Sequence, residues 1–156
     1  MLTTKKGSIA EAAIVCAAAK LGIHVLKPLT DGCRYDLIFD VDRRLIRVQC
    51  KWAPRDDDVV IVRCFSSRRN RDGLVRRCYD VDEVDAFAAY CAELDRCYFL
   101  PFRRFPGRLA IQLRLKPTGN NQKLGVNWAE EFEFERLDWN GFGAVAQLGE
   151  RLAGSQ

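Results

Sequence analysis

The sequence predicts an α/β domain with a central mixed β-sheet flanked by helices. An alanine-rich stretch over residues 8–21 places apolar residues at helical spacing. Short segments rich in β-branched and aromatic residues follow it, and turn-forming residues separate them. Such a mixture favours layers in which helices cover a sheet. With 156 residues and 48% hydrophobic composition the chain can bury one core, so we expect a single domain over residues 1–138 and a C-terminal tail over 139–156.

Two helices are expected. The first begins at Ser8, where a Ser-x-x-Glu pattern with Glu11 is typical of a helix cap, and it ends at Gly22. The second covers residues 82–94, where apolar residues recur at helical spacing behind acidic residues that suit a helix N-terminus.

Short strands alternate with turns along the rest of the chain. Asp42, Arg43 and Arg44 are a plausible hairpin link between the second strand and the third. The polar, basic segment 66–77 is either a loop or the tip of a long hairpin, and 127–129 is a short helical or extended piece. The strands are expected over residues 23–26, 35–40, 45–52, 58–65, 97–100 and 109–115.

The composition indicates a soluble protein of the cytoplasm, with no membrane partner. No stretch approaches the roughly 20 apolar residues that span a bilayer, and the first residues lack the apolar core of a secretory signal. The seven cysteines form no Cys-x-x-Cys pair and leave one over under any full pairing. Metal knuckles and a disulfide framework are therefore not expected, and a reducing compartment fits best.

The positive charge is concentrated in one part of the chain. The formal net charge is only +4, but residues 43–77 hold eleven Lys or Arg against four Asp. This local excess points to a polyanion as partner. The alternative is an ordinary solvated charged surface.

Polar residues stand at regular positions beside two of the expected strands. Asp36 lies in the segment 35–40, and alternation along 45–52 places Gln49 and Lys51 on one face. Hydrolysis of a phosphodiester at neutral pH needs a divalent cation that activates water, and Mg²⁺ prefers oxygen ligands such as carboxylates. Alternatively, Asp36 is a turn residue and the other two line the wet side of a sheet. The apolar residues around them favour a site, because such polar groups would otherwise be partly buried without cause.

The same residues carry a resemblance to a known family. Asp36, twelve intervening residues and then Gln49-Cys50-Lys51 resemble the signature of the PD-(D/E)XK nucleases, with Gln49 where Asp or Glu is usual. Glu11 resembles the additional helix carboxylate that many members place beside the metal. Further segments are similar to the bacterial group I intron homing endonucleases of this type and their free-standing relatives. These segments are 79–87, 98–101, 113–122 and 127–129, and with them the resemblance covers about residues 5 to 135.

The resemblance implies a restriction-endonuclease-like core and a metal-dependent, site-specific DNA endonuclease of the homing type. Asp36 would be a direct metal ligand, with Glu11, the Gln49 side chain and the Cys50 carbonyl as its partners. Lys51 would orient the attacking water and stabilise the charged phosphorus centre. Mg²⁺ is the expected cofactor, and Mn²⁺ can substitute for it. Alternatively, Glu11 is only the partner of the helix cap.

Double-stranded DNA is the expected partner, held by basic and amide side chains. The segment 66–77 would enter a groove as a β-ribbon, since Arg contacts phosphates and reads guanine edges. Cleavage of both strands by one small centre per chain predicts a homo-oligomer, either a dimer or a tetramer. The alternative for each position is an ordinary solvated side chain. The candidate DNA-binding residues are Arg68, Arg69, Arg71, Arg76, Arg77, Arg103, Arg104, Arg108, Arg114, Lys116, Asn120, Asn121 and Gln122.

Three functions stay open from the sequence. The first is a sequence-specific homing-type endonuclease. The second is a structure-directed nuclease that cuts branched DNA, as Holliday-junction resolvases do. The third is a nucleic-acid-binding module without activity.

The tail does not resemble the nuclease family. One permitted back-translation of residues 146–151 contains GCTC and GAGC separated by a loop, which resembles the D-arm of a transfer RNA gene. We hypothesise that the reading frame runs into such a gene over 143–152 and that the tail has no folding duty. The alternative is an ordinary short terminal helix.

Overall fold

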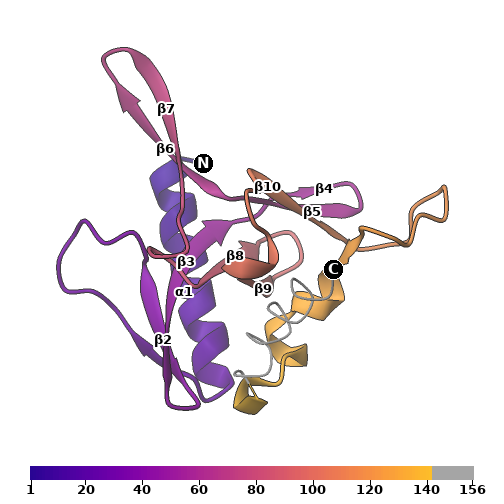
Figure 1. Cartoon of the computed structure of the whole chain (residues 1–156), viewed down its shortest axis with the longest axis horizontal. Coiled ribbons are helices and arrows are strands. Elements are labelled where there is room, and N and C mark those ends of the chain that lie inside the picture. Colours follow the sequence, from indigo (N-terminus) through magenta and orange to yellow (C-terminus); the bar gives the residue numbers. More distant parts are fainter. Residues whose placement is uncertain (142–156) are drawn as a thin grey trace.

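Helix α1 (Thr3–Lys20) lies against one face of the central sheet in the computed structural model of the chain, which describes residues 1–141 (Figure 1). Its buried residues are Ala10, Ile14 and Ala18, spaced four apart so that they form one stripe. The helix ends where predicted, with Gly22 at φ 78°.

The predicted helix cap is wrong. Because α1 begins at Thr3, Ser8 lies inside the helix, and its hydroxyl donates a 3.1 Å hydrogen bond to the carbonyl of Thr4. The start of the helix lacks a side-chain cap, so the Ser-x-x-Glu pattern did not mark it.

The central sheet is mixed, as predicted. Its strands follow the order β1 (His24–Leu26), β2 (Leu37–Val41), β3 (Arg44–Trp52), β8 (Ala86–Cys91) and β9 (Arg96–Pro101). The pair β3 and β8 is parallel, and the other neighbours are antiparallel. The α/β class and the central mixed sheet are therefore confirmed.

The second predicted helix, over 82–94, is wrong, because β8 is the strand next to the centre of the sheet. Ala86 and Ala88 pack into the core cluster that contains the α1 residues, whereas Phe87 and Ala89 pack into a second cluster on the opposite face. A strand that is buried on both faces reads as a continuous apolar run and has no period of two, so its alanines gave it a helical appearance.

A second, four-stranded sheet takes the place expected for a flanking helix. Its order is β11 (Asn127–Trp128), β10 (Ala110–Arg114), β5 (Val59–Arg63) and β4 (Arg55–Asp56). The inward residues of β5 and β10 join the second core cluster with β8. Four 3₁₀ turns complete the described chain: η1 (Phe102–Arg104), η2 (Ala129–Phe132), η3 (Phe134–Arg136) and η4 (Trp139–Gly141).

Strands β6 (Phe65–Asn70) and β7 (Gly73–Cys78) form a separate two-stranded ribbon that points away from the body of the domain (Figure 1). This confirms the hairpin alternative for 66–77. The strand predicted over 58–65 divides into β5 and the first residue of β6. The root of the ribbon is the end at which Phe65 pairs with Cys78, next to the body of the domain. Beyond this root the ribbon is exposed on both faces.

The described core reaches Trp139. This side chain is 7% exposed and packs against the rings of Phe39, Phe99 and Phe134, with centroid distances from 4.9 to 6.2 Å. The domain boundary after residue 138 stays a prediction. The hypothesis that residues 143–152 are read from a transfer RNA gene concerns a segment that lies outside the described residues.

Two further observations concern membrane-spanning helices and disulfides. None of the helices within residues 1–141 is both long and apolar enough to cross a membrane. All seven cysteines of the chain are unpaired.

Candidate active site

Asp36 lies at the edge of β3, just beyond the point where β2 leaves it. Asp42 and Arg43, both at positive φ, turn the chain so that β2 and β3 pair up to Leu37 and Val48. The Asp36 amide donates a 2.9 Å hydrogen bond to the Val48 carbonyl, and the Cys50 amide donates a 2.9 Å bond to Asp36 Oδ2. The carboxylate is therefore fixed against the backbone of β3.

Glu11 approaches this carboxylate from α1. Its charge raises the pKa of Asp36, so the two acidic groups lie within electrostatic range. The Glu11 carboxylate accepts a hydrogen bond from Lys27 Nζ, in the loop after β1. Because Ser8 lies inside α1, the alternative in which Glu11 is the partner of a helix cap at Ser8 is wrong.

Strand β3 presents its two predicted faces. Val48 and Cys50 contact the core cluster beneath α1. Gln49 and Lys51 alternate with them and thus lie on the opposite face, where they pair in register with Phe87 and Ala89 of β8. The sheet edge at Asp36 is therefore flanked by Glu11 on the helix side and by Lys51 on the other.

The Asp36 carboxyl is largely removed from water. Burial raises its pKa, the hydrogen bond from Cys50 opposes this, and the charge of Glu11 adds to the rise. Lys51 and Lys27 contribute smaller opposing effects. Two carboxylates gathered at a partly buried edge form a site where added positive charge is stabilising.

Lys51 is held by the root of the ribbon. Its Nζ donates a 2.8 Å hydrogen bond to the Phe65 carbonyl and a 3.2 Å bond to the Tyr79 hydroxyl. The pKa of Lys51 is lowered to about 8, mainly by burial and to a smaller extent by the charge of Arg34, while the charge of Asp36 opposes the shift. The side chain is therefore still mainly a cation at neutral pH.

The donor set suits a hard divalent cation. In a strand, the amide and carbonyl of one residue point to the same edge, so the Cys50 carbonyl points toward the side where its amide meets Asp36. Burial raises the pKa of the Cys50 thiol, which keeps the sulfur protonated and unsuited to bind metal. Within residues 1–141, no three His, Cys, Asp or Glu side chains gather around one point. Two carboxylates with the Cys50 backbone beside one of them fit Mg²⁺ or Mn²⁺, which bind few carboxylates and keep several waters.

Two residues near the centre were not predicted from the sequence. Arg34 donates hydrogen bonds to Glu83, Ser66 and the Cys78 carbonyl, and its guanidinium lies 4.2 Å from the centroid of the Tyr79 ring. Tyr79 contacts Lys51, from which it is 28 residues away. Only the position of Arg34 two residues before Asp36 and the place of Tyr79 at the start of a resembling block could have drawn attention to them.

The ribbon carries five of the candidate DNA-binding residues. Strand pairing places Arg69 and Arg76 on one face, Arg68 and Arg77 on the other, and Arg71 in the turn. The second pair lines a hollow of about 510 Å³ between the ribbon and the loop that holds Arg34. Arg77 also forms a 2.8 Å ion pair with Glu83, and Arg76 stacks on the Phe65 ring.

The remaining candidates lie on the second sheet and the turns around it. Arg103 and Arg104 belong to η1, and Arg104 lies over the Phe132 ring and near Glu131. Three other candidates line a polar hollow of about 440 Å³ together with Asn127 of β11: Arg108, Arg114 and Gln122. Lys116 pairs with Asp58, and Asn120 and Asn121 lie in the exposed loop before β11. Ribbon and second-sheet candidates thus form two separate groups.

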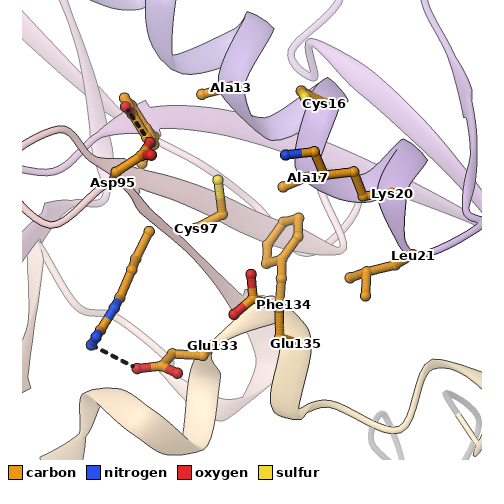
Figure 2. A pocket seen from close by; sticks show the side chains of 12 residues that line it. Ala13, Cys16, Ala17, Lys20, Leu21, Asp95, Cys97, Glu133, Phe134 and Glu135 are labelled. Atoms are coloured by element: carbon orange, nitrogen blue, oxygen red, sulfur yellow. Dashed lines mark hydrogen bonds and ion pairs between the residues drawn. The ribbon is translucent and has the colours of Figure 1, made fainter.

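A further hollow, of about 380 Å³, opens beside α1 (Figure 2). Cys16 from the helix and Cys97 from β9 line it, together with Glu133 and residues of η3. Its lining shares no residue with the candidate catalytic or DNA-binding sets, so it is separate from the site at Asp36.

Comparison with known proteins agrees with this geometry. A model of PD-(D/E)XK endonucleases matches residues 1–135. Among solved structures, the chain is similar to one described as a bacterial homing endonuclease, I-Ssp6803I, with 29% identity over 97% of both chains and a TM-score of 0.69. No curated protein matches the chain. The resemblance seen in the sequence is confirmed: the chain belongs to the PD-(D/E)XK endonuclease family.

Proposed function

We propose that this endonuclease is a homing-type enzyme that cuts double-stranded DNA at a specific site with Mg²⁺ as its cofactor, for which Mn²⁺ can substitute. The observation that carries the proposal is the arrangement at the open edge of β3. There the backbone of Cys50 holds Asp36, with Glu11 on the helix side and Lys51 on the other face. The similarity to a structure described as a bacterial homing endonuclease supports the homing type.

The four catalytic residues, together with the Cys50 carbonyl, fill three roles in the proposal. Asp36 and Glu11 would hold the cation with their carboxylates, and the Gln49 amide oxygen and the Cys50 carbonyl would supply neutral oxygens. The bound cation would lower the pKa of a water and offset the charge on the phosphoryl oxygens. Lys51 donates from its ammonium to the attacking water and to the charged phosphoryl group. A partly buried edge strengthens these electrostatic interactions.

DNA is held by the two groups of basic residues. A two-stranded ribbon fits the major groove, where Arg reads guanine, so the β6 and β7 arginines contribute recognition. The arginines of η1 and β10, with the 115–126 loop, contribute phosphate and backbone contacts. Tethering of the ribbon root to Lys51 through Phe65 supports a binding surface that adjoins the centre.

Two further aspects complete the proposal. A homo-oligomer, a dimer or a tetramer, supplies one centre for each DNA strand. The seven unpaired cysteines support action in the reducing cytoplasm.

A selection experiment tests the proposal. Purified wild type and Asp36→Ala are incubated with a library of random DNA targets and Mg²⁺, and the cut ends are sequenced. We expect the wild type alone to enrich one long target, and chelation of the metal to abolish cutting. Asp40→Ala, which changes an exposed acid on the neighbouring strand β2, is the control and should cut like the wild type.

The other functions predict different outcomes. A structure-directed nuclease would cut four-way junctions of any sequence and leave the random linear library intact. An inactive binding module would bind DNA without nicking it, even with Mn²⁺. Either result would replace the homing assignment.

A further inference from the structure

Lys51 is anchored by groups from the ribbon root. Its two hydrogen-bond acceptors, the Phe65 carbonyl and the Tyr79 hydroxyl, come from the first residue of β6 and the residue after β7. The ammonium also lies 4.7 Å from the centroid of the Tyr79 ring. The direction of this long, flexible side chain is thus set by contacts outside its own strand.

Tyr79 is in turn held firmly. Arg34 lies against its ring at 4.2 Å, and the Phe87 ring meets it edge to face at 5.5 Å. Burial raises the pKa of the Tyr79 phenol, so the hydroxyl stays neutral and can accept the hydrogen bond from the ammonium. The ring has little freedom to move without displacing a neighbour from a different element.

Arg34 locks this arrangement to both strands of the ribbon. Its guanidinium donates to Ser66 of β6 at 3.2 Å and to the Cys78 carbonyl of β7 at 3.0 Å. A third bond of 2.8 Å goes to Glu83, which also pairs with Arg77. Arg34 thereby fixes the distance between the ribbon root and the segment that carries Asp36.

We propose that Tyr79, braced by Arg34, is a positioning residue that aims the Lys51 ammonium at the reacting phosphate. The inference rests on the proposed function, because it assigns a purpose to the direction of Lys51 in the nuclease reaction. Fixing a flexible cation in advance lowers the entropy that is lost at the transition state. It also makes the centre depend on the ribbon that contacts DNA.

The first test is Tyr79→Phe, which keeps the ring and removes the hydroxyl. Under single-turnover conditions we expect the cleavage rate to fall about tenfold, because one hydrogen bond to a charged group is lost. The DNA concentration for half-maximal rate and the melting temperature should stay near wild-type values. Tyr90→Phe is the matched control: its hydroxyl bonds Asp95 at 2.9 Å, and its removal should leave cleavage unchanged.

The second test does not depend on cleavage. In an NMR spectrum of protein labelled with ¹⁵N at lysine Nζ, a hydrogen-bonded, protected ammonium gives an observable signal. The signal that is missing from the spectrum of Lys51→Met is assigned to Lys51. We expect Tyr79→Phe to weaken or abolish this signal, and Tyr90→Phe to preserve it. If the wild type cuts no DNA, the proposed function fails, and this spectrum alone decides whether Tyr79 holds Lys51.

The proposal is overturned by any of three results. One is a Lys51 signal that Tyr79→Phe leaves unchanged. Another is a Tyr79→Phe variant that cuts at the wild-type rate. The third is a variant whose cleavage, DNA affinity and melting temperature all fall together, which would assign Tyr79 to the fold alone.

Discussion

The Cys50 amide donates a 2.9 Å hydrogen bond to the Asp36 carboxylate at the place where β2 has left the edge of β3. This amide would otherwise lie at an open sheet edge without a partner. One bond therefore satisfies the backbone of β3 and fixes the proposed metal ligand beside the strand that carries Lys51.

Asp36→Asn separates the structural role of this carboxylate from its chemical one. The amide oxygen can still accept the hydrogen bond from Cys50, so we expect the melting temperature to change by only a few degrees. A neutral oxygen binds Mg²⁺ weakly, so cleavage should fall by roughly a hundredfold or more. Asp40→Asn, on the adjoining strand β2, is the control. Cleavage by Asp36→Asn within a few-fold of wild type would remove Asp36 from the metal site.

The β2 and β3 hairpin was predictable because its signals are local. The turn at Asp42 and Arg43, and the alternation that separates Gln49 and Lys51 from Val48 and Cys50, are properties of neighbouring residues. The resemblance added Glu11, whose approach to Asp36 depends on the packing of α1 against β3 and not on any local pattern.

Strand β8 and the Lys51 contacts could not be predicted in this way. Alternation disappears in a strand with a core cluster on each face, so Ala86 and Phe87 both read as apolar and the run resembles a helix. The bond from Lys51 to Tyr79 joins residues 28 apart. It exists only because the intervening ribbon brings its two ends together, and no short-range pattern encodes that closure.

Arg69→Gln should weaken DNA binding through loss of charge. Arg69 is exposed on the ribbon, so we expect a lower affinity and a slope of log affinity against log salt that is smaller by about one. Arg136→Gln is the control, because that guanidinium pairs with Glu130 of η2 and with Glu133, between η2 and η3, away from the ribbon. Equal effects of the two substitutions would show that the ribbon has no special part in binding.

Stability should depend on pH through Asp85. Burial raises the pKa of this carboxyl, but the hydrogen bonds from the Arg47 side chain and backbone outweigh burial, and the net shift is downward. A lowered folded-state pKa stabilises the protein above the carboxyl's usual value of about 4, and this stability is lost as the pH falls through the folded-state value. The difference in melting temperature between wild type and Asp85→Asn should therefore be constant from pH 7 to 5 and shrink below pH 4. A difference that grows on acidification would contradict this.

Trp139→Ala tests whether the core extends to η4. The indole is buried among three aromatic rings, and its Nε1 donates a 2.7 Å hydrogen bond to the Phe134 carbonyl. Its removal should lower the free energy of unfolding in urea by about 3 to 5 kcal/mol. Trp139→Phe fills part of the space and should cost less. A change below about 1 kcal/mol for the alanine variant would place the domain's end before this residue.

Lys27→Met should make the centre easier to load with metal. The Lys27 ammonium pairs with the Glu11 carboxylate, a proposed ligand, and the lysine side chain is 67% exposed, so the pair is weak and a cation has to compete with it. We expect the Mg²⁺ concentration for half-maximal cleavage to fall about two- to threefold, with the rate at saturating metal unchanged. Lys20→Met, at the C-terminal end of α1, the helix that carries Glu11, removes an equal charge and should leave the metal requirement unchanged. A higher metal requirement in Lys27→Met would mean that this lysine orients Glu11 for the metal and does not compete with it.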